Sequence, residues 1–135
     1  MSGPQVIVDL DIIEANTRAI THKCAESGIE VFGVTKGTCG MPQVARAMLR
    51  GGVTGIGESR FENIRRLRDS GLTCKILLLR SPPPSLVDDV VKDVDISLNS
   101  EIEIIEALSD AAIRRSKIHD IILMVDLGDL REGVW

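Results

Sequence analysis

Short, continuous apolar runs recur along the whole chain, and this repeat limits the fold more than any other feature of the sequence. The runs are rich in Val, Ile and Leu and come roughly every 20 to 25 residues. Continuous runs, in contrast to alternating ones, are typical of parallel strands that are covered on both faces. The six runs are QVIVDL, EVFGVT, TGIG, KILLL, DISL and IILMV.

Helix-like segments with clear start and stop signals lie between these runs. Pro42 suits the first turn of a helix, and glycines at 28, 51, 52 and 71 follow helical patterns, where a residue with positive φ can end a helix. Four segments begin with a capping residue and an acidic residue three positions later, which predicts a capping box at each start. These pairs are Asp11 with Glu14, Ser59 with Glu62, Ser85 with Asp88, and Ser100 with Glu103.

The alternation predicts an α/β fold of six strands and five helices in a single domain of 135 residues. Strands that alternate with helices form a parallel sheet through right-handed crossovers. Two architectures fit this pattern: a doubly wound open sheet, and part of a (β/α)₈ barrel, which needs two more units than the chain supplies. Periodicity does not distinguish them.

Composition excludes several classes of function. The net charge is −4, and Phe32, Phe61 and Trp135 are the only aromatic residues, so we expect no nucleic-acid partner. No apolar run is long enough to span a membrane and the N-terminus lacks a signal-peptide pattern, so we expect a cytoplasmic protein without a membrane partner. Three widely spaced cysteines predict free thiols, with neither a disulfide framework nor a metal site.

The ligand site of either architecture lies where the carboxyl ends of the strands meet. No stretch has the glycine spacing of a phosphate-binding loop. His22 and His119 lie far in sequence from any strand end, so we expect both to be solvated or packed. Lys36, directly after the second run, is the sharpest candidate: a neutral, shielded amine there could attack a carbonyl, or the charge could simply mark where the strand meets water. The polar residues expected at the strand ends are Asp9, Asp11, Lys36, Thr38, Cys39, Glu58, Ser59, Arg60, Arg80, Asn99, Asp126, Asp129 and Arg131.

Three segments resemble the N-terminal part of the alanine racemase-like, fold type III family of pyridoxal-phosphate enzymes, and most closely its ornithine-type racemase branch. They are VIVDLDIIEANTRAI, VFGVTKGTCGMPQVARAMLRGGVTGIGESRFENIRRLR and MVDLGDLREGVW. The resemblance implies a (β/α)₈ barrel that binds pyridoxal 5′-phosphate, with Lys36 at the Schiff-base position. It also implies an amino-acid substrate and a homodimer.

The resemblance assigns Arg131 a role as well. Arg131 matches the arginine of the family's D-x-G-x-x-R-x-G segment, which lies near the cofactor phenolate and the substrate carboxylate; the alternative is a surface charge. Asp126 is expected to shape that turn. Cys39 stands where relatives nearest alanine racemase carry an aromatic residue, which favours a longer substrate such as ornithine or lysine over alanine; Cys39 is a small loop filler or a reactive thiol.

Under this interpretation residues 1–135 are the N-terminal part of the barrel, without its remaining strands and the family's C-terminal β-domain. We expect such a chain to be inactive by itself, and to pair with another copy or aggregate through its uncovered apolar surface. The alternatives are a non-catalytic pyridoxal-phosphate carrier of the same fold, and a decarboxylase or aldolase that uses the same lysine and cofactor.

Overall fold

Five parallel strands form one sheet in the computed structural model, which describes residues 3–135. The strands are β1 (Phe32–Val34), β2 (Gly55–Glu58), β3 (Lys75–Leu78), β4 (Ile96–Asn99) and β5 (Asp120–Leu123). Each strand pairs with the next one along the chain, from β1 at one edge to β5 at the other. The predicted α/β class with a parallel sheet is therefore confirmed.

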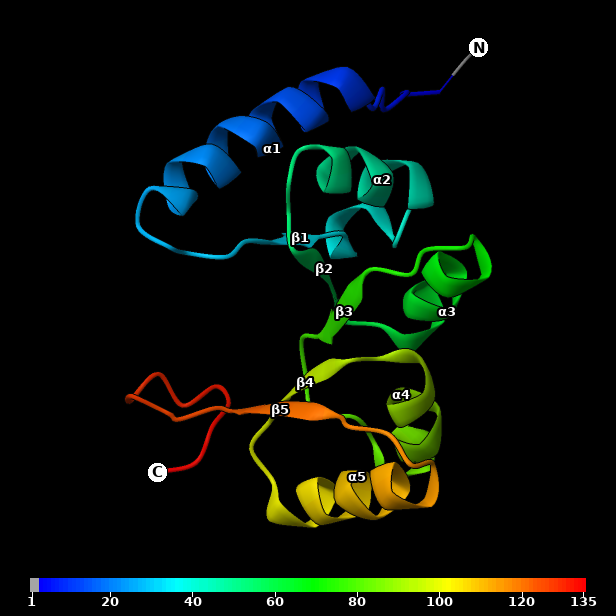
Figure 1. The fold of residues 1–135 in the computed structure, drawn as a ribbon, viewed down its shortest axis with the longest axis vertical. Helices are drawn as coiled ribbons and strands as arrows, with labels where there is room; N and C mark the ends of the chain where they lie inside the picture. The colour runs from blue at the N-terminus through cyan, green and yellow to red at the C-terminus, as the bar shows by residue number, and fades with distance from the viewer. Residues whose placement is uncertain (1–2) are drawn as a thin grey trace.

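The consecutive strand order decides between the two architectures that the sequence left open. A doubly wound sheet reverses its strand order at a switch point, whereas a (β/α)₈ barrel adds each strand beside the previous one. The order β1-β2-β3-β4-β5 has no reversal. Figure 1 shows the connecting helices α2, α3 and α4 along the same side of the sheet, which is the arrangement of a barrel wall.

The prediction of a sixth strand over QVIVDL is wrong. Residues 3–9 have no regular secondary structure, and the side chains of Val6 and Ile7 are 92% and 88% exposed. A strand is stable only when its amide and carbonyl groups pair with a neighbour. Within residues 3–135 the segment has no such partner, so its apolar character alone does not make it a strand.

Five α-helices lie within the described residues. They are α1 (Leu10–Ala25), α2 (Pro42–Arg50), α3 (Phe61–Asp69), α4 (Val87–Asp93) and α5 (Ile102–Arg114), with short 3₁₀ turns η1 (Lys36–Thr38) and η2 (Pro84–Leu86). Pro42 begins α2 as predicted, and glycines 28, 52 and 71 have positive φ after helices. None of these helices is long and apolar enough to cross a membrane.

None of the four predicted capping boxes forms at the predicted residues. Asp9, not Asp11, caps α1: its carboxylate accepts hydrogen bonds from the amides of Asp11 and Ile12 at 3.1 and 3.0 Å. The helices α3, α4 and α5 begin without a side-chain cap from Ser59, Ser85 or Ser100. Just before α3, the buried carboxylate at the end of β2 accepts hydrogen bonds from the amides of Ser59 and Arg60, as described below.

The two faces of the sheet differ in cover. On one face Ile56 and Ile76 pack against α3 and α4 in a fully buried core, where each aliphatic side chain contributes about 1.5–3 kcal/mol. On the other face the strands carry small or apolar residues: a Cβ added to Gly57 would contact Val34 and Leu79 at 3.3 Å. This second face is open in residues 3–135, and the side chains of the candidate site lie at its carboxyl end.

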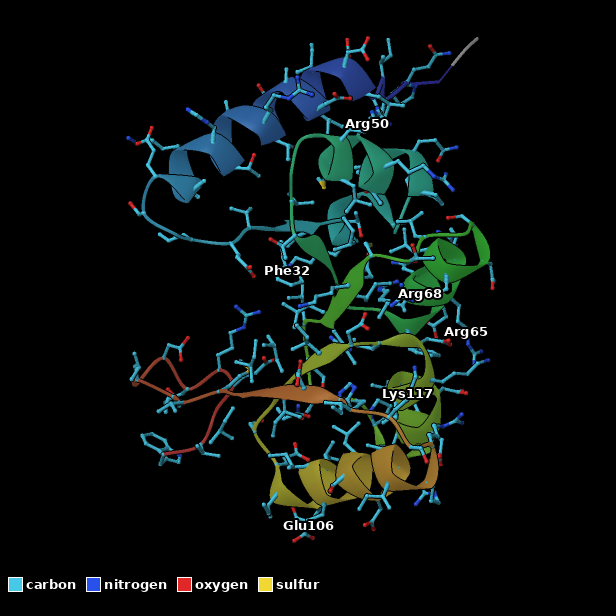
Figure 2. The ribbon with its side chains drawn as sticks, viewed as in Figure 1. Phe32, Arg50, Arg65, Arg68, Glu106 and Lys117 are labelled. Carbon is cyan, nitrogen blue, oxygen red and sulfur yellow. The ribbon has the colours of Figure 1, made fainter. Side chains whose placement is uncertain are left out.

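The helix α1 lies outside this core. Every residue of α1 is at least partly exposed, and the helix lies against α2, with polar contacts at the junction. Glu14 accepts hydrogen bonds from Arg18 and Arg50 at 2.6 Å, and the Thr21 hydroxyl donates to the Gly51 carbonyl at 2.7 Å. The hydrogen bond from Arg50, together with both arginine charges, lowers the pKa of the Glu14 carboxyl. Figure 2 shows Arg50 at this junction.

Candidate active site

The end of β1 leads directly into a tight turn that carries Lys36. We call residues 35–40 the lysine turn. The Thr35 carbonyl accepts hydrogen bonds from the amides of Thr38 and Gly40 at 3.0 and 3.1 Å and from the Thr38 hydroxyl at 3.1 Å. Because one carbonyl accepts three donors, the chain reverses within a few residues and the Lys36 side chain leaves from the carboxyl end of the strand.

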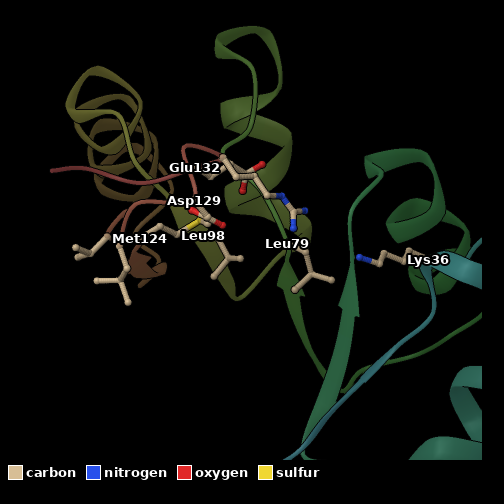
Figure 3. A pocket seen from close by; sticks show the side chains of 9 residues that line it. Lys36, Leu79, Leu98, Met124, Asp129 and Glu132 are labelled. Carbon is tan, nitrogen blue, oxygen red and sulfur yellow. The ribbon is translucent and has the colours of Figure 1, made fainter.

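A cavity of about 410 Å³ lies at the carboxyl end of the open face. Figure 3 shows the Lys36 side chain extending toward Leu79 at one side of this cavity, with Met124, Asp129 and Glu132 on the other side. Strands β1, β3, β4 and β5 or the loops after them all contribute side chains. The lining residues are Lys36, Leu79, Leu98, Met124, Val125, Leu127, Asp129, Arg131 and Glu132.

The structure thus brings Lys36 and Arg131 to the same cavity from opposite ends of the chain. Neither side chain forms an ion pair or a hydrogen bond within residues 3–135, although Asp129 and Glu132 line the same cavity. Both cationic groups are therefore available to a ligand. An amine beside a guanidinium suits a molecule that combines a carbonyl with an anionic group, because the first can condense and the second can pair with two oxygens.

The shielding expected for Lys36 is not present in this chain. Lys36 is exposed, because the open face of the sheet has no cover within residues 3–135. The apolar wall of Leu79, Leu98 and Met124 covers only one side of the cavity. The described residues thus supply the amine and its direction but not a dry environment.

Hydrogen bonds between its own residues fix the loop that carries Arg131. The Asp126 carboxylate accepts hydrogen bonds from the amides of Gly128 and Leu130 at 2.7 and 3.3 Å, and the first of these is the main reason that the pKa of Asp126 is lowered. The Asp126 amide donates to the Val134 carbonyl at 2.9 Å, and the Val134 amide to the Met124 carbonyl at 2.9 Å. The predicted structural role of Asp126 in this turn is confirmed.

Cys39 has an unusual backbone in the lysine turn. Its φ is 53°, in the left-handed region, and its side chain is exposed. Its carbonyl accepts a hydrogen bond from Arg66 on α3. The thiol forms no hydrogen bond within residues 3–135, and the contacts that Cys39 makes in the turn are those of its backbone.

Two residues expected among the strand-end polar groups lie on the other face of the sheet. Glu58 and Asn99 are fully buried on the side of the helices and do not line the cavity. Sequence reasoning missed this because the side chains of a strand alternate between faces, and only the register shows which face each residue takes. Glu58 accepts a hydrogen bond from Thr35 in the lysine turn. No pattern in the sequence predicts this contact.

Asn99 belongs to a polar network beneath β4 and β5. Its amide donates to the Ser97 carbonyl and hydroxyl at 3.0 and 2.9 Å, and the Ser97 hydroxyl lies 2.8 Å from Nε2 of His119. Burial of the ring lowers the pKa of His119. The packing role expected for His119 is confirmed. No group of three or more metal-ligating side chains gathers anywhere in the described residues.

Comparison with known proteins identifies the family of this chain. The family model of the alanine racemase N-terminal domain matches residues 8–135. The ornithine racemase of Acetoanaerobium sticklandii is 38% identical over 132 residues, covering 98% of this chain and 37% of the relative. The lysine racemase of Thermotoga maritima is 35% identical over 135 residues, covering 100% of this chain and 38% of the relative.

Solved structures share the fold. The D-threonine aldolase of Filomicrobium marinum superposes with a TM-score of 0.83 at 19% identity, over 98% of this chain and 37% of that one, and alanine racemases superpose as well. The chain belongs to the alanine racemase family through the family's N-terminal domain. It spans a little more than a third of the length of the curated relatives that it matches.

Proposed function

We propose that residues 1–135 form the lysine-bearing part of a pyridoxal-phosphate-dependent amino-acid racemase that acts on ornithine, lysine or another amino acid longer than alanine. The observation that carries the proposal is the meeting of Lys36 and Arg131 at one cavity. The similarity to an ornithine and a lysine racemase supports the substrate class. A homodimer that completes the active site belongs to the same proposal.

The residues present fit the cofactor. Pyridoxal phosphate supplies an aldehyde for an amine and a conjugated ring that spreads the charge left when an α-proton is removed. Lys36 is a primary amine at an open cavity with no competing ion pair in the described residues, so it is free to hold the aldehyde. With the cofactor bound, Lys36 would hold its aldehyde, and the same Nζ would be the group of this chain that removes or returns a proton at the α-carbon.

Arg131 orients the substrate in this scheme. A guanidinium can pair with both oxygens of a carboxylate, which fixes the plane of that group and hence the direction of the α-proton. The closed loop around Asp126 holds the backbone of Arg131 in place. The apolar wall of Leu79 and Leu98 suits the methylene chain of a longer amino acid.

The test of this proposal is replacement of Lys36 by alanine in the longest polypeptide that contains residues 1–135. We expect Lys36→Ala to lose the cofactor that survives gel filtration and to lower racemase turnover by about 10²–10⁴-fold or more, because the amine is both the anchor and a proton-transfer group. Reduction with borohydride followed by peptide mapping should place the label on residue 36 of the unchanged protein. Retention of bound cofactor and turnover in the variant would refute the proposal.

Lys92→Ala is the matched control, since Lys92 is exposed on α4 and outside the cavity. The variant should keep both cofactor and turnover. A D-threonine aldolase shares the fold, so the same preparations should be assayed for aldehyde release and for carbon dioxide release. Either product in place of the opposite enantiomer would assign the lysine to an aldolase or a decarboxylase. Cofactor binding at Lys36 without any turnover would indicate a carrier.

A further inference from the structure

The lysine turn is bonded to a fully buried carboxylate that the proposed chemistry does not use. The Thr35 hydroxyl donates a hydrogen bond to Oε2 of Glu58 at 3.1 Å, and both side chains have 0% exposure. A buried carboxylate is costly unless it is well paired. Such a group is therefore kept for a structural or functional reason.

The second oxygen of Glu58 faces a different element. Oε1 accepts hydrogen bonds from the amides of Ser59 and Arg60 at 2.7 and 3.3 Å, directly before α3 begins. Amides at the start of a helix have no partner within the helix and favour a negative group. Glu58 thus joins the start of α3 to the residue that precedes Lys36.

Two further contacts fix the lysine turn against α3. Gly40 has a φ of 64°, and a Cβ added there would lie 2.7 Å from Cβ of Asn63. Arg66 donates to the carbonyl of Cys39. The far end of the turn is therefore held by α3 directly. Its near end is held at Thr35, where the amide donates to the Gly57 carbonyl at 3.1 Å and the hydroxyl donates to Glu58.

We infer that Glu58, acting through Thr35, is a positioning residue for Lys36: it orders the lysine turn so that the Lys36 amine is directed into the cavity. This inference rests on the proposed function for its chemical meaning. A residue on the covered face of the sheet thus helps to position a side chain of the site on the open face. Glu58 touches neither the cavity nor a ligand there, so it acts only through the turn.

The experiment compares Thr35→Val with Thr35→Ser in the longest polypeptide that contains residues 1–135. Valine has the shape of threonine without its hydroxyl, whereas serine keeps the hydroxyl. The measured quantity is the rate at which pyridoxal phosphate is fixed at Lys36 by cyanoborohydride, relative to its rate at the exposed Lys92 in the same sample. We expect Thr35→Val to lower this ratio about tenfold and Thr35→Ser to restore it to within about twofold.

Glu58→Gln and Glu62→Gln complete the set. An amide at residue 58 can still accept from the two backbone amides and donate to the Thr35 hydroxyl, so the ratio should change by less than about threefold. Glu62 is exposed on the same helix start, and Glu62→Gln should leave the ratio unchanged. Where Thr35→Val does not fold, Glu58→Leu gives the same test: it removes the acceptor of the Thr35 hydroxyl, and the ratio should fall about tenfold, well below that of Glu58→Gln.

A second measurement needs no cofactor. Hydrogen exchange of the Thr38, Cys39 and Gly40 amides should be about tenfold faster in Thr35→Val than in Thr35→Ser, because the near end of the turn loses its side-chain anchor and keeps only the backbone bond to β2. Faster exchange with an unchanged labelling ratio would overturn the positioning role, as would an unchanged exchange rate. If the unmodified protein shows no preference for Lys36, the proposed function fails, and the exchange rates still decide whether Glu58 orders the turn.

Discussion

The proposed chemistry depends on the backbone of a few residues after β1. Lys36 follows Thr35, whose carbonyl accepts three hydrogen bonds and whose hydroxyl is held by Glu58. Within the same turn, Gly37 and Gly40 have opposite surroundings. A Cβ at Gly37 would meet no atom within 4 Å, whereas one at Gly40 would press on Asn63.

This contrast gives a prediction for stability. Gly40→Ala should lower the free energy of unfolding by about 2 kcal/mol, because alanine disfavours a φ of 64° and its methyl group would contact Cβ of Asn63 at 2.7 Å. Gly37→Ala, three residues earlier, should change the free energy by less than about 0.5 kcal/mol. Urea unfolding followed by circular dichroism measures both. Equal effects of the two substitutions would contradict this view of the turn.

The helices are joined to the sheet by a small number of polar side chains. Arg68, at the end of α3, donates to the carbonyls of Leu72, Cys74 and Asp93 and to the carboxylate of Asp95. That carboxylate also accepts from the Ile76 amide of β3 at 2.8 Å. One guanidinium therefore ties α3 to the loops before β3 and β4, as Figure 2 allows the reader to follow.

We expect Arg68→Lys to lower the free energy of unfolding by about 2 kcal/mol, since an ammonium group on a thinner side chain cannot reach all four acceptors. Arg65→Lys on the same helix is the control. Arg65 is half exposed and pairs with Asp89 at 2.6 Å, so its replacement should cost less than about 0.5 kcal/mol. Thermal and urea unfolding of both variants test the difference. A similar loss in both would show that Arg68 acts as an ordinary surface charge.

Sequence patterns predict which strands and helices exist better than they predict where a helix starts or whether a strand finds a partner. The runs that became β1 to β5 were recognised from apolar continuity, because each has partners on both sides or a covering helix. The same signal failed at Val6 and Ile7, where pairing partners are missing in the described chain. Capping pairs failed because the helices begin one or two residues from Ser59 and Ser100, a shift that tertiary contacts decide.

At the scale of the whole molecule, strand order and register lie beyond what periodicity can predict. Lys36 and Arg131 follow β1 and β5, the two edges of the sheet, and no sequence pattern predicts that both side chains line one cavity. Glu58 was assigned to the same group of strand-end residues, but its register places it on the covered face. Long-range packing decides which side chains share a cavity and which face of the sheet each one takes. Local sequence patterns do not contain this information.

The open face predicts how residues 1–135 behave when expressed alone. Within residues 3–135, β5 pairs with β4 only, so its outer edge has no partner strand, and its Ile121, Ile122 and Leu123 are 41%, 47% and 52% exposed. An exposed apolar edge of this kind is a template for pairing with another copy. We expect concentration-dependent association in sedimentation velocity, reduced by Ile122→Lys and unaffected by Ile102→Lys, since Ile102 is exposed at the start of α5. A single monomeric species at every concentration would contradict this.

Within residues 3–135, helices cover one face of the sheet and the candidate site lies on the other, so rigidity and ligand contact are divided between the two faces. The covered face supplies rigidity, and the amine and guanidinium project from the rim of the uncovered one. Under the proposed function, the Leu79 and Leu98 wall affects which amino acid fits, whereas Lys36 holds the cofactor. Leu98→Phe should therefore change substrate preference and leave the attachment of the cofactor at Lys36 intact, as measured by racemase assays on an amino-acid panel and by borohydride labelling.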